Sequence, residues 1–316
     1  MTRADSIESK HWGSYALFQE GQVNGSNPKF ANRSICIRSS AKPFQAFTCL
    51  KLGVELNNKQ LAICSGSHSG SAEHTNLLLE LLQESTIKSE ELHCGEHQPL
   101  DPETPYANKG STRRRLQNNC SGKHIMMLMA CKLKGWPTNN YESLEHPLQK
   151  EIIKDLANLC NVEESSIGLG LDGCGLPTYT FKVKDFLLGF SKLSSHSGNK
   201  HLQQLTKAFS EEPFFVTGKN RLDYEITKLY KGQLICKSGA GGLSVISFQN
   251  TTKPSSLILK MVDGNERVRA VILRKILNKF KLVNESLENK QTSSSYFSSD
   301  INNLHGQTAS QIELNI

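Results

Sequence analysis

The stretch Arg38-Ser39-Ser40-Ala41-Lys42-Pro43-Phe44 places a serine and a lysine three residues apart. An extended run over residues 34–38 precedes it, and an apolar helical run over residues 44–52 follows it. Because residues i and i+3 share a helix face, the Ser39 hydroxyl and the Lys42 amine can meet. A lysine can take the serine proton if burial or a second cation lowers its pKa. The stretch therefore predicts a serine nucleophile with a lysine base.

Ser-x-x-Lys alone also fits a helix start with a hydroxyl cap and a solvated lysine. A second signature favours a catalytic role over a helix cap: Lys237-Ser238-Gly239 lies between predicted strands over residues 234–236 and 243–248. In serine β-lactamase-like enzymes a helix carries the first signature and a sheet-edge strand the second, facing each other across a cleft. The middle signature of those enzymes, Ser-Asp-Asn, is absent here, and so is an export signal, which argues against an enzyme that recognises penicillin.

The composition indicates a cytoplasmic globular protein. The chain has 316 residues, of which 37% are hydrophobic and 21% charged, and no apolar run approaches the about 18–20 residues of a membrane span. Residues 1–10 contain no apolar segment typical of a secretory signal. Nine cysteines, an odd number, favour a reducing compartment over a disulfide framework. The formal charge of +7 is scattered without an aromatic-interleaved basic stripe, so we expect no nucleic-acid partner.

The hydrophobic periodicity predicts a mixture of strands and helices in one domain over residues 1–283. Strands are expected over residues 14–19, 34–38, 234–236, 243–248 and 257–262. Helices are expected over residues 44–52, 73–84, 125–133, 147–160, 183–193, 202–209, 221–230 and 268–280. Residues 93–117 read as a long irregular loop, and residues 168–177 as a tightly bent glycine-rich segment. The polar tail, residues 284–316, is expected to be partly disordered, in particular over residues 293–299.

Further motifs between and around these two signatures carry a resemblance that covers roughly residues 3–282. They are Glu8-Ser9-x-His11-x-Gly13, Arg38-Ser39-x-x-Lys42-Pro43, Ser67-His68-Ser69-Gly70, Cys94-Gly95-x-His97-x-Pro99, Asn119-Cys120-Ser121-Gly122-Lys123-His124, Asp172-Gly173-Cys174-Gly175-x-Pro177, Lys237-x-Gly239-Ala240-x-Gly242 and Lys260-x-x-Asp263-Gly264. In this order they resemble the Rhizobium-etli-type L-asparaginases. Gly241 departs from the pattern, because it stands where a glutamate is expected, and the tail is unlike the usual ending.

The resemblance implies a mixed α/β fold of the serine β-lactamase/glutaminase-like class, an antiparallel-rich sheet packed with helices. It also implies a homodimer that hydrolyses L-asparagine to L-aspartate and ammonia. Ser39 with Lys42 matches the nucleophile and its base, and Ser67 with Lys237 a second pair that stabilises charge and relays the proton. Whether Ser65, Ser67 or Ser69 serves in the second pair stays open, and Ser67 is our choice.

The candidate substrate-binding residues are Arg38, His68, Asp172 and Gly239. Asp172 orients the site or holds the substrate ammonium, and a purely structural role in its turn is the alternative. For His68 a packing role is the alternative.

A zinc site formed by Cys120, Lys123 and Cys174 is also implied by the resemblance. Cysteine sulfurs suit zinc, but a lysine must lose its proton before it can bind a metal. His124 is a commoner ligand type, yet as the neighbour of Lys123 it points elsewhere on the helix. Buried cysteines without any such role are the alternative for both thiols. A Ser–Lys hydrolase needs no metal for its nucleophile, so zinc would serve substrate binding.

Two rival functions remain on the same scaffold. A glutaminase or broader amidase is one, because one methylene of substrate length is worth only about 1–3 kcal/mol of discrimination. A non-catalytic amino-acid-binding protein is the other, suggested by Gly241 and the altered tail.

Overall fold

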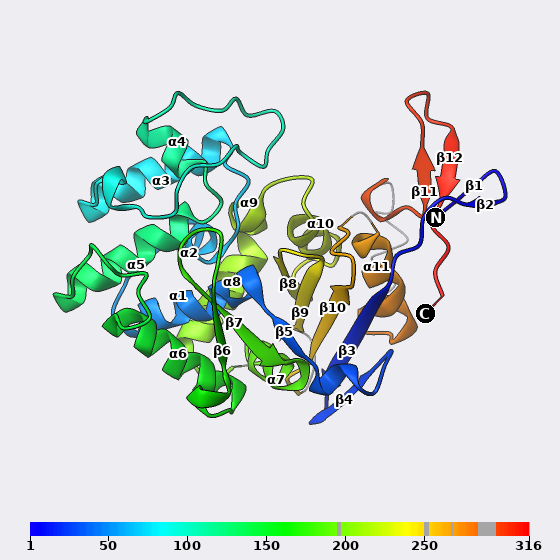
Figure 1. Cartoon of the computed structure of the whole chain (residues 1–316), viewed down its shortest axis with the longest axis horizontal. Coiled ribbons are helices and arrows are strands. Elements are labelled where there is room, and N and C mark those ends of the chain that lie inside the picture. Colours follow the sequence, from blue (N-terminus) through cyan, green and yellow to red (C-terminus); the bar gives the residue numbers. More distant parts are fainter. Residues whose placement is uncertain (195–196, 250–252, 267, 284–294, 316) are drawn as a thin grey trace.

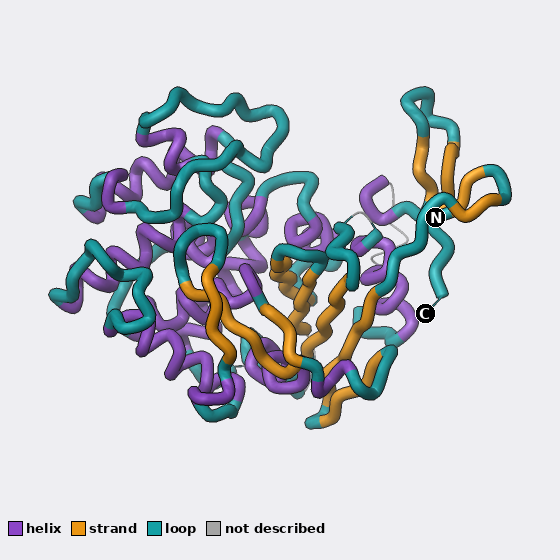
Figure 2. Tube along the Cα trace, viewed as in Figure 1, coloured by secondary structure: helices purple, strands orange, loops and turns teal. Residues whose placement is uncertain are grey.

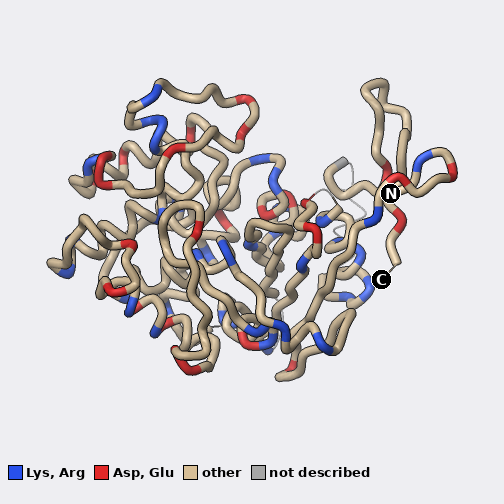
Figure 3. Tube along the Cα trace, in the orientation of Figure 1, with Lys and Arg blue, Asp and Glu red and all other residues tan. Residues whose placement is uncertain are grey.

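The computed structural model describes residues 1–194, 197–249, 253–266, 268–283 and 295–315. Figure 1 shows a largely helical half beside a half built on an antiparallel sheet, with both chain ends close together at the far side of the sheet. Figure 2 shows that long loops cover the top of the helical half. Lysine and arginine residues are spread over both halves and interspersed with acids (Figure 3). No helix in the described residues is long and apolar enough to cross a membrane.

Within the described residues the strands form three sheets, with orders β4-β3-β10-β9-β8, β5-β7-β6 and β11-β12-β1-β2, and every strand pairing in them is antiparallel. Their bounds are β1 (Thr2–Arg3), β2 (Ser6–Ile7), β3 (Gly13–Gln19), β4 (Gln22–Gly25), β5 (Ser34–Cys36), β6 (Gly168–Leu171), β7 (Pro177–Lys182), β8 (Leu234–Gly239), β9 (Leu243–Phe248), β10 (Ser256–Met261), β11 (Asp300–Asn302) and β12 (Thr308–Gln311).

The α-helices are α1 (Lys42–Lys51), α2 (Asn58–Ser65), α3 (Ala72–Ser85), α4 (Thr112–Leu116), α5 (Ser121–Lys134), α6 (Pro147–Cys160), α7 (Val183–Ser191), α8 (Lys200–Glu211), α9 (Pro213–Thr217), α10 (Leu222–Leu229) and α11 (Arg269–Lys279). A mixed α/β fold in which an antiparallel sheet packs with helices was predicted, and the structure confirms it.

The five-stranded sheet separates two apolar cores, because side chains alternate between the two faces of a strand. On β9, Val245 belongs to the core shared with the helical half, whereas its neighbour Ile246 belongs to the core beneath α10 and α11. On β10, Ile258 likewise belongs to the core shared with the helical half and Leu259 to the core beneath α10 and α11. Helix α7 packs against β3, β9 and β10, and α10 against β8. Helices therefore cover both faces, and the end of β8 lies where the two halves meet.

Several predicted boundaries move. The strand expected over residues 34–38 ends at Cys36, because Arg38–Ala41 form a 3₁₀ turn that leads into α1. The strand expected over residues 234–236 continues to Gly239, so the whole Lys-Ser-Gly signature lies within β8. The segment over residues 168–177 contains β6 and the connection to β7, which pairs with β6 as a β-hairpin, so only the connection is bent tightly. The long loop over residues 93–117 contains α4.

The described part of the polar tail contains a 3₁₀ turn and two short strands, β11 and β12. Strands β11 and β12 pair with each other, and Gln311 of β12 pairs with Thr2 of β1, so the two ends of the chain share one sheet. Residues 295–297 form a 3₁₀ turn whose Phe297 is buried in the core beneath α11. Residues 293–294, the first two of the segment expected to be disordered over residues 293–299, lie outside the described residues. The domain boundary at residue 283 stays a prediction.

Candidate active site

A cavity of about 480 Å³ opens between the two halves, beside the end of β8. Its walls carry polar and charged side chains from the helical half, from α10 and α11, and from the tail. The lining residues are Ser39, Ser67, Leu100, Asn119, Thr217, Asn220, Arg221, Leu222, Asp223, Lys237, Ser238, Gly239, Ala240, Glu266, Arg269 and Tyr296. Three of the four predicted catalytic residues, Ser39, Ser67 and Lys237, therefore share one cavity.

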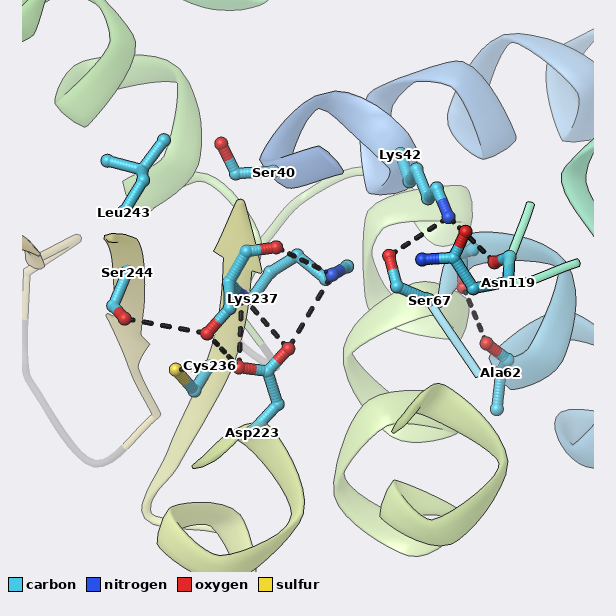
Figure 4. A network of polar contacts seen from close by, with 12 residues as sticks. Ser40, Lys42, Ala62, Ser67, Asn119, Asp223, Cys236, Lys237, Leu243 and Ser244 are labelled. Atoms are coloured by element: carbon cyan, nitrogen blue, oxygen red, sulfur yellow. Dashed lines mark hydrogen bonds and ion pairs between the residues drawn. The ribbon is translucent and has the colours of Figure 1, made fainter. Parts of the chain in front are cut away.

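Lys42 is the fourth, and it lies buried beside this cavity with 1% of its surface exposed. It is the first residue of α1, and its amine donates to Ser67 Oγ at 2.9 Å and to the Asn119 carbonyl at 3.0 Å (Figure 4). Burial lowers the pKa of Lys42 to about 8, and the neighbouring Lys123 and Lys237 charges add to this effect, while Cys120 opposes it. A lysine in this state has the properties of a general base.

Close backbone approaches set the position of Ser67. The amide of Ser67 donates to the carbonyl of Val216 at 2.7 Å, which ties the segment after α2 to α9. A Cβ on Gly66 would lie 2.1 Å from the same carbonyl oxygen, so only glycine permits this approach. Ser67 lines the cavity, whereas Ser65 Oγ donates to the Leu61 carbonyl at 2.6 Å. The choice of Ser67 for the second catalytic pair stays a prediction.

The hydrogen bonds pair the serines and lysines differently from the sequence prediction. Lys42 contacts Ser67, whereas Ser39 makes no side-chain hydrogen bond in the part of the chain that the structure describes. Ser39 lies in the 3₁₀ turn, is half-buried, and faces the cavity. The preceding residue, Arg38, has φ of +46°, a left-handed conformation that is uncommon for a non-glycine residue and found mostly where surrounding structure enforces it. The catalytic roles of the four residues stay predictions.

Lys237 is held by a carboxylate that sequence reasoning missed. Its amine lies 3.5 Å from Asp223 Oδ2, with 1% and 4% of the two side chains exposed, and donates to the Ser238 carbonyl at 2.8 Å. Asp223 also accepts from the Ser238 amide at 2.9 Å and from the Ser238 hydroxyl (Figure 4). Burial lowers the pKa of Lys237, against the opposing attraction of Asp223. Burial would raise the pKa of Asp223, but Lys237 and the Ser238 hydrogen bonds lower it below its usual value.

The predicted substrate-binding residues are dispersed. Gly239 lines the cavity, and a Cβ there would lie 3.1 Å from the Ile37 carbonyl, so glycine lets β8 pass close to the 3₁₀ turn. Arg38 and Asp172 form an ion pair at 2.8 Å, outside the residues that line this cavity. His68 is fully buried, bonds Ser121 Oγ through Nε2 at 3.0 Å, and also lies outside the lining.

Cys120, Lys123 and Cys174 lie within interaction distance of one another, the first two at the start of α5 and the third in the turn between β6 and β7. Their role as zinc ligands stays a prediction. The hydrogen bond from Cys174 lowers the pKa of Cys120 well below its usual value, and the Lys42 and Lys123 charges contribute. The same hydrogen bond raises the pKa of Cys174, and burial adds to it. Burial would lower the pKa of Lys123, but the two sulfurs raise it. These directions favour the charged forms of Cys120 and Lys123 and the neutral form of Cys174.

The donor set of this cluster fits zinc only with lysine as a ligand. Among the described residues, no group of three or more His, Cys, Asp or Glu side chains could hold a metal. His124, the alternative ligand, is turned away: its Nδ1 lies 2.6 Å from the Tyr141 hydroxyl. Two sulfurs and the Lys123 nitrogen suit zinc, provided that binding removes the protons of Lys123 and Cys174.

Comparison with known proteins gives the family. A family model described as L-asparaginase II matches residues 1–314. The chain belongs to the L-asparaginase II family. Family membership confirms the resemblance stated from the motifs and supports the predicted enzyme class, an amidohydrolase. No curated protein matches the chain.

Solved structures are similar only at a distance. Mglu in its native form is 10% identical over 85% of this chain and 64% of its own, with a TM-score of 0.45. A protein of Bacteroides dorei described as a beta-lactamase is 12% identical over 84% and 93%, with a TM-score of 0.42. A glutaminase of Bacillus subtilis in covalent complex with 5-oxo-L-norleucine is 13% identical over 87% and 89%, with a TM-score of 0.36. The chain thus spans less than two thirds of that Mglu chain, and likenesses this remote do not establish an activity.

Proposed function

We propose that this chain is an L-asparaginase that hydrolyses the side-chain amide of L-asparagine to L-aspartate and ammonia. The observation that carries the proposal is the buried Lys42 at 2.9 Å from Ser67, in the same site as Ser39 and Lys237, in a member of the L-asparaginase II family. A buried lysine whose pKa is lowered to about 8, beside two serines at a cavity wall, suits acyl transfer, because it can take up a serine proton far more readily than an ordinary lysine. A homodimer and a cytoplasmic location rest on the resemblance and the composition, and both belong to the proposal.

In the proposed reaction the Ser39 oxygen bonds to the amide carbon while its proton passes to the Lys42 amine. The developing oxyanion lies opposite the buried Lys237 cation, which stabilises it in a site with little water. The proton then goes to the leaving nitrogen, the C–N bond breaks, and ammonia departs from an acyl-enzyme. Water attacks this ester, with Lys42 again taking a proton, and L-aspartate leaves. Ser67 is the relay, because it already accepts a hydrogen bond from Lys42.

One observation favours a second assignment within the same reaction. Ser67, not Ser39, is the hydroxyl in direct contact with Lys42. In this alternative Ser67 would be the nucleophile and Ser39 a group that binds the substrate. Both assignments give the same products, so the choice concerns the site and not the reaction.

Ammonia release from L-asparagine and from L-glutamine by the purified chain tests the function. We expect release from L-asparagine, and weaker release from L-glutamine because its extra methylene must fit the same cavity. Comparable rates with both amides would favour the broader amidase. Folded protein that releases ammonia from neither, yet binds L-asparagine in a calorimetric titration, would favour the amino-acid-binding protein.

Zinc, when bound, would be held by Cys120, Lys123 and Cys174 and would supply a positive charge that attracts anionic parts of a ligand. We expect about one zinc per chain in protein purified without chelator, and loss of most of it in Cys120→Ser. The measurement is metal analysis of both proteins together with their melting temperatures. Cys36→Ser is the matched control, because Cys36 is half-buried on β5, where its sulfur contacts the Thr178 hydroxyl at 3.5 Å, and the variant should keep its zinc. Metal-free wild type with full affinity for L-asparagine would contradict the zinc site.

A further inference from the structure

The positively charged side chains on the cavity wall differ in whether they form ion pairs within the protein. Lys237 is paired with Asp223 at 3.5 Å. Arg269 lies 3.5 Å from Glu266 and donates to the Leu243 carbonyl at 2.6 Å. Each of these cations is therefore balanced by an acid that also lines the cavity.

Arg221 differs from them. It is half-buried, lines the cavity together with Ser39 and Ser67, and lies close enough to Lys237 to lower the pKa of that lysine. Its side chain makes no hydrogen bond or ion pair with any residue that the structure describes. Arg38, the cation that the sequence suggested for substrate, is instead neutralised by Asp172 at 2.8 Å and lies outside this lining. Among the described residues that line the cavity, Arg221 thus offers a guanidinium with no hydrogen bond or ion pair to the protein.

We propose that Arg221 is the residue that binds the α-carboxylate of the amino-acid substrate. A guanidinium matches a carboxylate through two parallel N–H···O hydrogen bonds, which a point charge such as lysine cannot reproduce. Arg221 is the residue immediately before α10, and Asp223 lies in the first turn of the same helix. One short segment would therefore anchor the substrate carboxylate and hold Lys237, which fixes the distance between the anchored end of the substrate and the catalytic groups.

This inference rests on the proposed amidase function and deepens it, because it explains selection of α-amino acids over simple amides. It predicts that the contribution of Arg221 appears only with substrates that carry the carboxylate. Three amides separate the possibilities: L-asparagine, succinamate, which keeps the carboxylate and lacks the ammonium, and 3-aminopropanamide, which keeps the ammonium and lacks the carboxylate.

The test compares wild type, Arg221→Gln and Arg221→Lys with all three amides. For Arg221→Gln we expect kcat/KM to fall by about 30-fold or more with L-asparagine and succinamate, mainly through KM, because two charge-assisted hydrogen bonds are lost. With 3-aminopropanamide, kcat/KM should stay within about 2-fold of the wild-type value, since no contact to Arg221 exists to be lost. With L-asparagine and succinamate, kcat/KM of Arg221→Lys should lie between the values for wild type and Arg221→Gln. Arg3→Gln, on the terminal sheet, is the control and should change nothing.

An equal loss with all three amides in Arg221→Gln would overturn the proposal and show that Arg221 supports the site as a whole. Unchanged kinetics with L-asparagine would overturn it as well. If Arg221→Gln does not fold, the same comparison with Arg221→Lys decides. If wild type releases no ammonia at all, the proposed function fails, and calorimetric binding of L-asparagine and 3-aminopropanamide still tests Arg221. A selective loss of L-asparagine binding in the variant would uphold its role, and equal binding by both proteins would refute it.

Discussion

Replacing Ser39 with alanine is expected to lower kcat for ammonia release from L-asparagine by at least about 10³-fold, with KM nearly unchanged. The reason is that no covalent intermediate can form without the attacking oxygen, while the groups that bind the substrate remain. Ser39 is half-buried in a 3₁₀ turn and makes no side-chain hydrogen bond within the described residues, so its removal should hardly change the melting temperature. Steady-state kinetics and a thermal unfolding curve of the same sample are the measurements.

Ser67→Ala is the matched control variant, and a covalent trap decides between the two serines. 6-Diazo-5-oxo-L-norleucine is the reagent from which the covalent complex of the Bacillus subtilis glutaminase was formed. Trypsin separates the two candidates, because Ser39 falls in the peptide over residues 39–51 and Ser67 in the peptide over residues 60–88. We expect the added mass on residues 39–51 in wild type and no label in Ser39→Ala.

Label on residues 60–88 would instead make Ser67 the nucleophile, as its contact with Lys42 at 2.9 Å allows. Ser67→Ala should then be the more damaged variant. With Ser39 as nucleophile, Ser67→Ala should keep measurable turnover and lose about 10²–10⁴-fold, the usual contribution of a positioned proton-transfer group. Full activity in Ser39→Ala would remove Ser39 from the chemistry altogether.

Local patterns in the sequence predicted much of this fold. The 3.6-residue periodicity over residues 147–160 gave the bounds of α6, and the short apolar run over residues 243–248 gave β9. Both elements are strongly apolar on their buried faces, and such patterns are determined by residues close together in the chain. The hairpin of β6 and β7 was missed because four glycines between residues 168 and 175 indicate bending and give no alternation of side chains.

The sequence named several residues that line the candidate site, but it did not predict which of them contact each other. Ser67 is 25 residues from Lys42 in sequence, and a contact across that separation depends on how α2 packs against α1 and α9. Asp223 gave no signal, because one acid in the amphipathic segment over residues 221–230 reads as part of a solvated helix face. Only the pairing of α10 with β8 shows that it is buried and faces Lys237. The two strands of the tail gave no sequence signal for a related reason: they are short and polar, and β12 pairs with β1 at the other end of the chain.

Asp223→Asn is expected to destabilise the protein by about 3–5 kcal/mol at neutral pH, because it leaves Lys237 buried without its counter-charge. It also weakens the hydrogen bonds by which the end of β8 is tied to α10 through Ser238. In wild type the pKa of Asp223 is lowered, so its contribution to stability is present above the ordinary Asp pKa of about 3.9 and is lost as the pH falls through the lowered value. Urea unfolding at pH 7 of wild type and Asp223→Asn measures the loss.

The pH dependence of the variant separates loss of the ion pair from simple loss of packing. Without Asp223 the pKa of Lys237 falls further below the ordinary value of about 10.4, because burial is no longer opposed. Arg221, Lys42 and Arg269 also face this region as cations and push in the same direction. The unfolded chain then binds more protons than the folded one, so the stability of Asp223→Asn should rise as the pH increases from the lowered Lys237 pKa towards about 10. Adding Lys237→Met to Asp223→Asn should restore part of the lost stability and abolish its rise with pH. If the single and the double variant instead show the same loss of unfolding free energy at every pH, Asp223 does not act by balancing the charge of Lys237.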